Sequence, residues 1–126
     1  MAKKFLIDTD VFSDYLMGEP RAKEFFENLP EGTFYYSALT KLELLSSNAC
    51  NDPAIRSSTS ALLSLGKKIE IDDSVGNLAA EVKRQHNLSV SDSIMAATAL
   101  NIKAELVTRN VGEFKKIKEL LLMKPY

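Results

Sequence analysis

The chain has 126 residues, 45% of them hydrophobic and 26% charged, which is the size and composition of one globular domain. Its 16 basic and 17 acidic side chains give a formal net charge of −1, so it does not bind nucleic acid merely by being basic overall. One cysteine and one histidine exclude an internal disulfide and a cysteine zinc site, and they leave few residues for histidine-based hydrolase chemistry.

The first third of the chain predicts two strands and two helices. Residues 4–7 are an apolar run typical of a strand, and residues 11–17 have the spacing of a helix. Pro20 suits the first position of a second helix. A turn at 30–32 then leads to a second strand at 33–37, which is rich in β-forming residues.

The rest of the chain continues this alternation. The Thr-x-x-Glu pattern of Thr40 and Glu43 is typical of a capping box and predicts that a helix begins there. The later predicted elements are a helix at 53–65, a strand at 68–71, a helix from 72 or 73 to about 85, a helix from 91 or 92 to 99 or 100, a strand at 104–108, a helix at 113–121 and an edge strand at 122–123. Together these elements predict one α/β domain over residues 1–126, with a mainly parallel sheet.

The N-terminal apolar run reaches Asp8 too soon for the core of a signal peptide. No apolar run approaches the roughly 18 residues of a membrane span. We therefore expect a cytoplasmic protein without a membrane partner.

Four polar places follow or face the predicted strands. Asp8 comes directly after the first strand, Glu43 lies in the helix after the second, Asp92 opens an apolar helix, and Asn110 and Glu113 follow the strand at 104–108. Ligands bind beyond the carboxyl ends of the strands in open α/β sheets. Several carboxylates in one cleft repel each other unless a cation is present, and hard oxygen ligands select Mg²⁺ or Mn²⁺. This pattern favours metal-assisted hydrolysis of a phosphodiester.

Each of these acids also has an ordinary structural interpretation. Asp8 and Thr9 could form a simple turn, and Glu43 could serve only its capping box. Asp92 could be an acid that the helix dipole favours, and Glu113 could be a solvated side chain. The convergence of the four places on one edge of the sheet is what favours a functional site.

These residues resemble the four motifs of PIN domains, and most closely those of the VapC-type ribonuclease toxins of prokaryotic toxin–antitoxin pairs. The match runs in order from residue 5 to about residue 114. The motifs are Ile-Asp-Thr-Asp-Val at 7–11, Thr-Lys-Leu-Glu-Leu around Glu43, Asp-Ser-Ile-Met-Ala-Ala-Thr-Ala from Asp92, and Thr-Arg-Asn-x-x-Glu-Phe from Thr108.

The resemblance implies a three-layer PIN-like fold and a Mg²⁺- or Mn²⁺-dependent endoribonuclease, with Asp8, Glu43 and Asp92 as its central acids. Relatives place a fourth acid at either of two positions, which here hold Asn110 and Glu113. An asparagine offers an oxygen but no charge, so both the fourth ligand and a second metal stay open. The resemblance also implies a homodimer and an antitoxin whose segment lies across the active-site groove.

Three further residues of the motifs have supporting roles by the same resemblance. Thr9 and Thr108 would supply hydroxyls that position carboxylates or water. Asp10 occupies a place where relatives accept Asn, Ser or Asp.

Basic residues gather near the fourth motif. Residues 103–126 carry six bases against three acids. Arg109 is a candidate contact for an RNA phosphate, and Lys115 and Lys116 follow closely enough to attract RNA, although each could also be a solvated side chain. His86 closes a predicted helix, where the dipole favours a cation, and we expect no catalytic role for it.

Two rival interpretations stay open. Asp8 and Asp10 after an apolar strand also suit a haloacid-dehalogenase-type phosphatase, with Asp8 as nucleophile and Asp10 as general acid. The other rival is a catalytically silent PIN-like domain that serves as a binding module; loss of a central acid usually marks such domains, and this chain retains all three.

Overall fold

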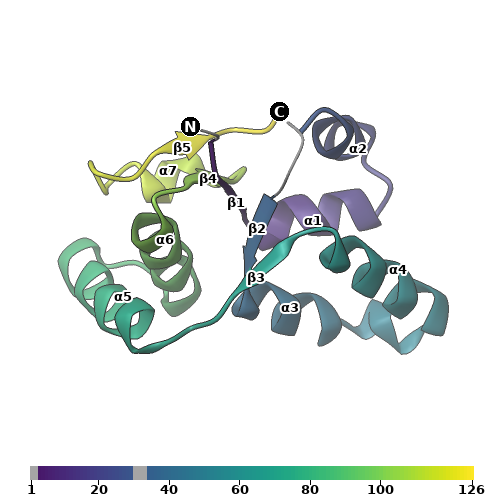
Figure 1. The fold of residues 1–126 in the computed structure, drawn as a ribbon, viewed down its shortest axis with the longest axis horizontal. Helices are drawn as coiled ribbons and strands as arrows, with labels where there is room; N and C mark the ends of the chain where they lie inside the picture. The colour runs from purple at the N-terminus through teal and green to yellow at the C-terminus, as the bar shows by residue number, and fades with distance from the viewer. Residues whose placement is uncertain (1–2, 30–33) are drawn as a thin grey trace.

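A five-stranded parallel sheet forms the centre of the computed structural model, which describes residues 3–29 and 34–126. The strand order is β3-β2-β1-β4-β5, and every neighbouring pair runs parallel (Figure 1). The strands are β1 (Phe5–Ile7), β2 (Phe34–Ser37), β3 (Lys67–Ile69), β4 (Glu105–Val107) and β5 (Leu122–Met123). The predicted α/β fold is confirmed, and β1 lies at its centre.

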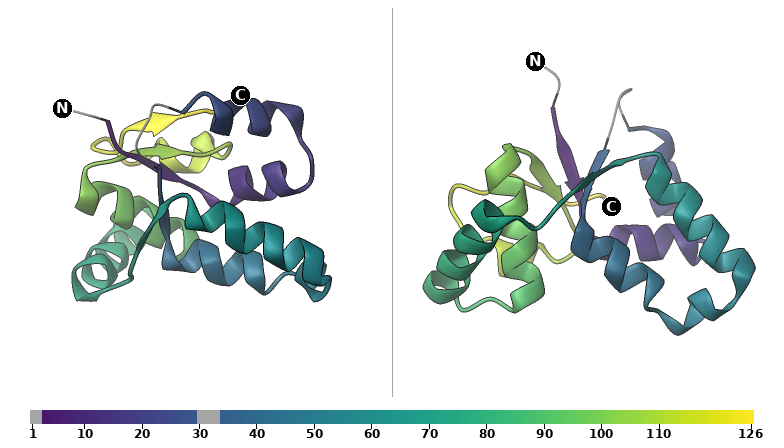
Figure 2. Two further views of the ribbon diagram at one scale, coloured as in Figure 1. Left: turned by 45° about the vertical axis from the view of Figure 1, so that its right-hand side comes forward. Right: turned by 60° about the horizontal axis from the view of Figure 1, so that its bottom comes forward.

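Helices cover both faces of this sheet and give the three layers (Figure 2). One layer holds α5 (Asp73–His86), α6 (Val90–Ile102) and the short α7 (Val111–Phe114). The other holds α1 (Thr9–Leu16), α2 (Pro20–Glu27), α3 (Ala38–Leu45), the 3₁₀ turn η1 (Asn48–Asn51) and α4 (Pro53–Ser64). Among the described residues, no helix is long and apolar enough to cross a membrane.

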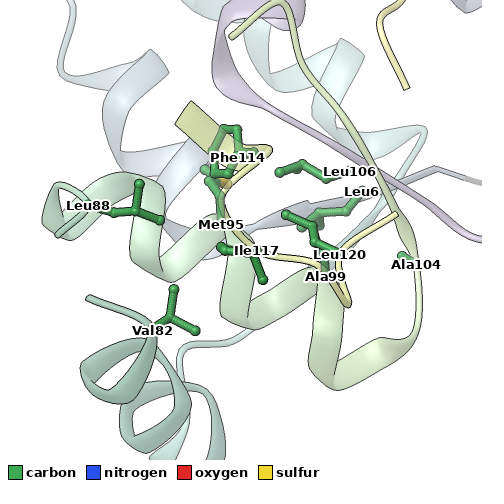
Figure 3. Close-up of a cluster of buried hydrophobic side chains, with 11 residues drawn as sticks. Leu6, Val82, Leu88, Met95, Ala99, Ala104, Leu106, Phe114, Ile117 and Leu120 are labelled. Atoms are coloured by element: carbon green, nitrogen blue, oxygen red, sulfur yellow. The ribbon is translucent and has the colours of Figure 1, made fainter. Parts of the chain in front are cut away.

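Two hydrophobic cores separate the layers, because successive side chains of a strand point to opposite faces. Leu6 of β1 packs with Leu106, Met95 and Phe114 on the α5–α6 side (Figure 3). Phe5 and Ile7 face the other core, which contains the Phe12 ring and its aromatic neighbours. A strand covered on both faces is apolar throughout, which is why the apolar run at 4–7 correctly predicted β1.

The predicted capping box of Thr40 and Glu43 is wrong. Helix α3 begins at Ala38, and its cap is Ser37, whose hydroxyl accepts a hydrogen bond from the Leu39 N–H at 3.0 Å. Ser37 is extended at the end of β2, so it can cap the helix at once without an intervening loop. Thr40 therefore lies inside the first turn and is fully buried.

Several other boundaries differ from the predicted ones. Helix α1 begins at Thr9 directly after its cap Asp8, and β3 ends at Ile69. Helix α6 begins at Val90, after its cap Ser89, and not at 91 or 92. The helix predicted at 113–121 is wrong, because α7 ends at Phe114 and the chain then turns twice to bury Ile117 and Leu120 in the core. The predicted turn at 30–32 and the first residue of the strand predicted at 33–37 lie outside the described residues.

The turn before β3 provides a test of the packing. A Cβ atom added at Gly66 would clash with the ring of Phe34, so we expect Gly66→Ala to lower the free energy of unfolding by about 1–3 kcal/mol. Gly76 of α5 has open space around it, so Gly76→Ala is the matched control and should stabilise the helix by about 0.5–1 kcal/mol. Denaturant unfolding of both variants measures this, and equal effects would contradict the packing at Gly66.

Candidate active site

Asp8 is the residue that joins the central strand to the first helix, and both of its carboxylate oxygens are held. Its Oδ1 accepts a hydrogen bond from the Thr9 N–H at 2.8 Å, which makes Asp8 the N-cap of α1. Its Oδ2 accepts a hydrogen bond from the Thr108 hydroxyl at 2.7 Å, across the β1–β4 pair. Asp8 is thus fixed in place by the backbone of its own helix and by the end of β4.

Burial makes the charged form of Asp8 unfavourable. Desolvation, with a further contribution from the Asp10 carboxylate and a smaller one from Asp92, raises the pKa of Asp8 from 3.8 to about 6. The hydrogen bonds from Thr108 and Thr9 oppose this increase without cancelling it. A carboxylate held in this way gains stability from a nearby cation.

Glu43 is connected to the same place by a chain of hydroxyl groups. The Thr9 hydroxyl donates to Glu43 Oε1 at 2.7 Å, and it lies 2.9 Å from the Thr40 hydroxyl. Since Thr9 has only one hydroxyl proton, Thr40 is the donor to Thr9. Thr40 is therefore a residue of this site that the sequence does not reveal, because its spacing to Glu43 is typical of a helix cap.

Asp92 and Glu113 complete the group of acids. Asp92 lies in the first turn of α6, and burial raises its pKa, with Glu113 and Glu43 raising it further against the opposing hydrogen bond from Ser89. The Glu113 carboxylate also pairs with Lys116 at 3.1 Å. Glu113 acts electrostatically on Asp92, whereas Asn110 contacts this place through its backbone, whose N–H donates to the Thr108 hydroxyl.

Arg109 has protein partners of its own. Its Nε lies 2.8 Å from Asp14 Oδ2 and its Nη2 donates to Asp14 Oδ1, while its backbone N–H donates to Asp10 Oδ2 at 3.3 Å. Burial raises the pKa of Asp10, and Arg109 opposes this. The Tyr126 hydroxyl donates to the same Asp14 carboxylate. The sequence singles out neither residue, because Asp14 is an ordinary acid of a predicted helix and Tyr126 lies beyond the last motif.

The chemistry of these donors fits a hard divalent cation. Asp10 and Asp92, the charged side chains that act on Asp8, offer carboxylate oxygens, and the buried Asp10 Oδ1 has no hydrogen-bond partner among the described residues. Within residues 3–29 and 34–126, no three acidic, histidine or cysteine side chains already form a group that could hold a metal ion. Ligation would therefore require the carboxylates to draw closer together.

Comparison with known proteins assigns the family. The sequence model of the PIN domain matches residues 5–120, so the chain belongs to the PIN-domain family, as its four motifs predicted. A search of curated proteins found no match. The fold of the PIN family is thus shown, and it replaces the phosphatase interpretation of Asp8 and Asp10.

Solved structures with the same fold include a toxin–antitoxin complex, VapBC and FitAcB. A toxin–antitoxin complex from Klebsiella pneumoniae is similar with a TM-score of 0.84 and 26% identity, over 96% of this chain and 97% of that one. DNA-bound VapBC from Salmonella typhimurium has a TM-score of 0.82 and 21% identity, over 99% and 100% of the two chains. FitAcB from Neisseria gonorrhoeae has a TM-score of 0.79 and 24% identity, over 96% and 97%.

The raised pKa of Asp8 predicts how stability depends on pH. Because the folded pKa of about 6 exceeds the unfolded value, the metal-free protein should lose stability as the pH rises from about 4 to above 6. Asp8→Asn keeps the helix cap and removes the buried charge, so it should raise the free energy of unfolding at pH 7.5 by about 1–3 kcal/mol. Denaturant unfolding of wild type and variant, with chelator, at about pH 4 and at pH 7.5 measures these free energies. A variant that is less stable than wild type at pH 7.5 would contradict the assignment.

Proposed function

We propose that this PIN-domain chain is a metal-dependent endoribonuclease and the toxin of a type II toxin–antitoxin pair. The observation that carries the proposal is the placement of Asp8 at the end of the central strand, where Thr9 links it to Glu43. Asp92 helps to raise the pKa of Asp8, and Glu43 and Glu113 help to raise the pKa of Asp92. Acids with a purely structural role are seldom brought together in this way, whereas a metal-dependent phosphodiesterase needs several carboxylates at its active site.

The cofactor in this proposal is Mg²⁺ or Mn²⁺, held by Asp8, Asp92 and Glu43, with Glu113 or Asn110 as a further ligand. When bound, the cation supplies a Lewis acid that lowers the pKa of a water molecule and stabilises charge on the phosphate. The chain itself orients these ligands: Thr108 and Thr9 hold Asp8, and Thr9 also holds Glu43. His86 closes α5 and is left without a role in the reaction.

RNA is the substrate in this proposal, and the affinity of the protein for RNA should depend on the bound metal. Apart from Asp8, Asp10, Glu43, Asp92 and Glu113, the chain has 12 acids against 16 bases, so the rest of the molecule is mildly basic. Lys115 and Lys116 are exposed beside the site and are the proposed phosphate contacts. A cation at the acids would remove their repulsion of the RNA backbone.

An antitoxin and a second copy of the chain are the proposed partners. Support for an antitoxin comes from the Klebsiella pneumoniae structure, which is a toxin–antitoxin complex, and from an apolar groove beside Glu43. Leu16, Met17 and Ile55 line this groove, and Met17 is 83% exposed. A partner helix or strand with apolar side chains would cover this exposed surface.

Cleavage of single-stranded RNA with Mn²⁺ tests the proposal. We expect Asp8→Asn and Asp92→Asn to lower the cleavage rate by more than about 100-fold, since each removes a charged ligand. His86→Ala is the control and should lose less than about tenfold, because the metal needs no histidine base. Circular dichroism of each variant checks that it is folded.

The outcomes separate the alternatives. Cleavage that persists in folded Asp8→Asn would contradict the metal site. A wild-type protein that neither cleaves RNA nor binds Mn²⁺ by calorimetry would favour the binding module. A phosphoenzyme that forms on wild type and is lost in Asp8→Asn would restore the phosphatase.

A further inference from the structure

A second polar cluster lies beside the carboxylates and ties the C-terminal segment to α1 and α2. Asp14 Oδ2 accepts a hydrogen bond from the Tyr126 hydroxyl and forms an ion pair with Arg109 Nε at 2.8 Å. The Arg21 guanidinium lies 5.0 Å from the centroid of the Tyr126 ring, and Arg21 Nε pairs with Glu19 at 2.9 Å. The C-terminus consequently lies beside α2 (Figures 1 and 2).

This cluster is connected to Asp8 through the turn after β4. Arg109 stands between Thr108, which donates to Asp8, and Asn110, whose N–H donates to the Thr108 hydroxyl at 3.0 Å. The backbone N–H of Arg109 also donates to Asp10, one helical turn before Asp14 on α1. The Arg109–Asp14 pair therefore holds the 108–110 turn against the helix that Asp8 caps.

Tyr126 orients the Asp14 carboxylate that pairs with Arg109. Arg109 and Asp14 are 47% and 23% exposed, and an ion pair with that exposure contributes little by itself. The Tyr126 hydroxyl binds the same carboxylate oxygen and so restricts its rotation. Burial and the Asp14 carboxylate raise the pKa of the Tyr126 phenol, which keeps it a donor. Its segment follows β5, whose Met123 carbonyl accepts the Thr108 N–H at 3.1 Å.

We propose that Tyr126 is a positioning residue of the nuclease site. Through Asp14 and Arg109 it holds the 108–110 turn, and with it the hydroxyl that Thr108 directs at Asp8. Arg109 then serves the orientation of Asp8 and does not bind RNA. The proposal rests on the proposed function, since the consequence of misplacing this turn is a slower reaction with unchanged substrate binding.

The test uses Tyr126→Phe, Asp14→Asn and the double variant that carries both substitutions. The control is Tyr15→Phe, which removes a tyrosine hydroxyl of α1 that is outside the cluster. We expect kcat to fall about tenfold in Tyr126→Phe with KM for RNA unchanged, because the lost hydrogen bond is to a charged group. Adding Tyr126→Phe to Asp14→Asn should have little further effect. Tyr15→Phe should keep wild-type kcat.

A measurement that does not depend on RNA cleavage separates the role of Tyr126 from the proposed function. In ¹H–¹⁵N spectra of the metal-free protein, Tyr126→Phe should move the amide signals of Thr108, Arg109 and Asn110, and Tyr15→Phe should leave them in place. Unchanged amide signals, or a raised KM at unchanged kcat, would overturn the role of Tyr126. A wild-type protein without cleavage would contradict the proposed function alone, because the amide signals still decide whether Tyr126 holds the turn.

Discussion

The burial of the Asp8 carboxylate at the end of the central strand is the constraint on which the site depends. The preceding β1 residues are closed off by side chains on both faces of the sheet, so the first polar residue after them is partly removed from water. Its raised pKa records the free-energy cost of that position. The surrounding groups either satisfy this carboxylate, as Thr9 and Thr108 do, or add to its repulsion, as Asp10 does.

The parts of the fold that the sequence predicted are those set by burial alone. Strand β1 is covered on both faces and so is a short apolar run, and β4 is buried and apolar after Glu105; each ends at a polar residue. Asp8 could be singled out because it follows such a run directly, and Asp92 because it precedes an apolar helix. Their meeting at one edge followed from a parallel sheet, which the alternation of strands and helices predicted.

The features that the sequence did not predict depend on competition between two possible helix caps, or on contacts between residues that are far apart in the chain. Ser37 and Thr40 are both acceptable helix caps in the sequence, and only the end of β2 at Ser37 decides between them. Thr40 then turns inward and becomes part of the site. Asp14 and Tyr126 are 112 residues apart, so no local pattern links them, and the contact exists only because β5 joins the sheet beside β4.

The most direct test of the account is anomalous diffraction at the manganese absorption edge, from crystals of the wild-type protein grown with Mn²⁺. The account predicts a manganese peak bonded to carboxylate oxygens of Asp8 and Asp92, with Glu43 or Glu113 drawn toward it. A map without a peak at Asp8, or with manganese only at acids elsewhere on the surface, would contradict the central claim that buried carboxylates at this edge of the sheet are a metal site.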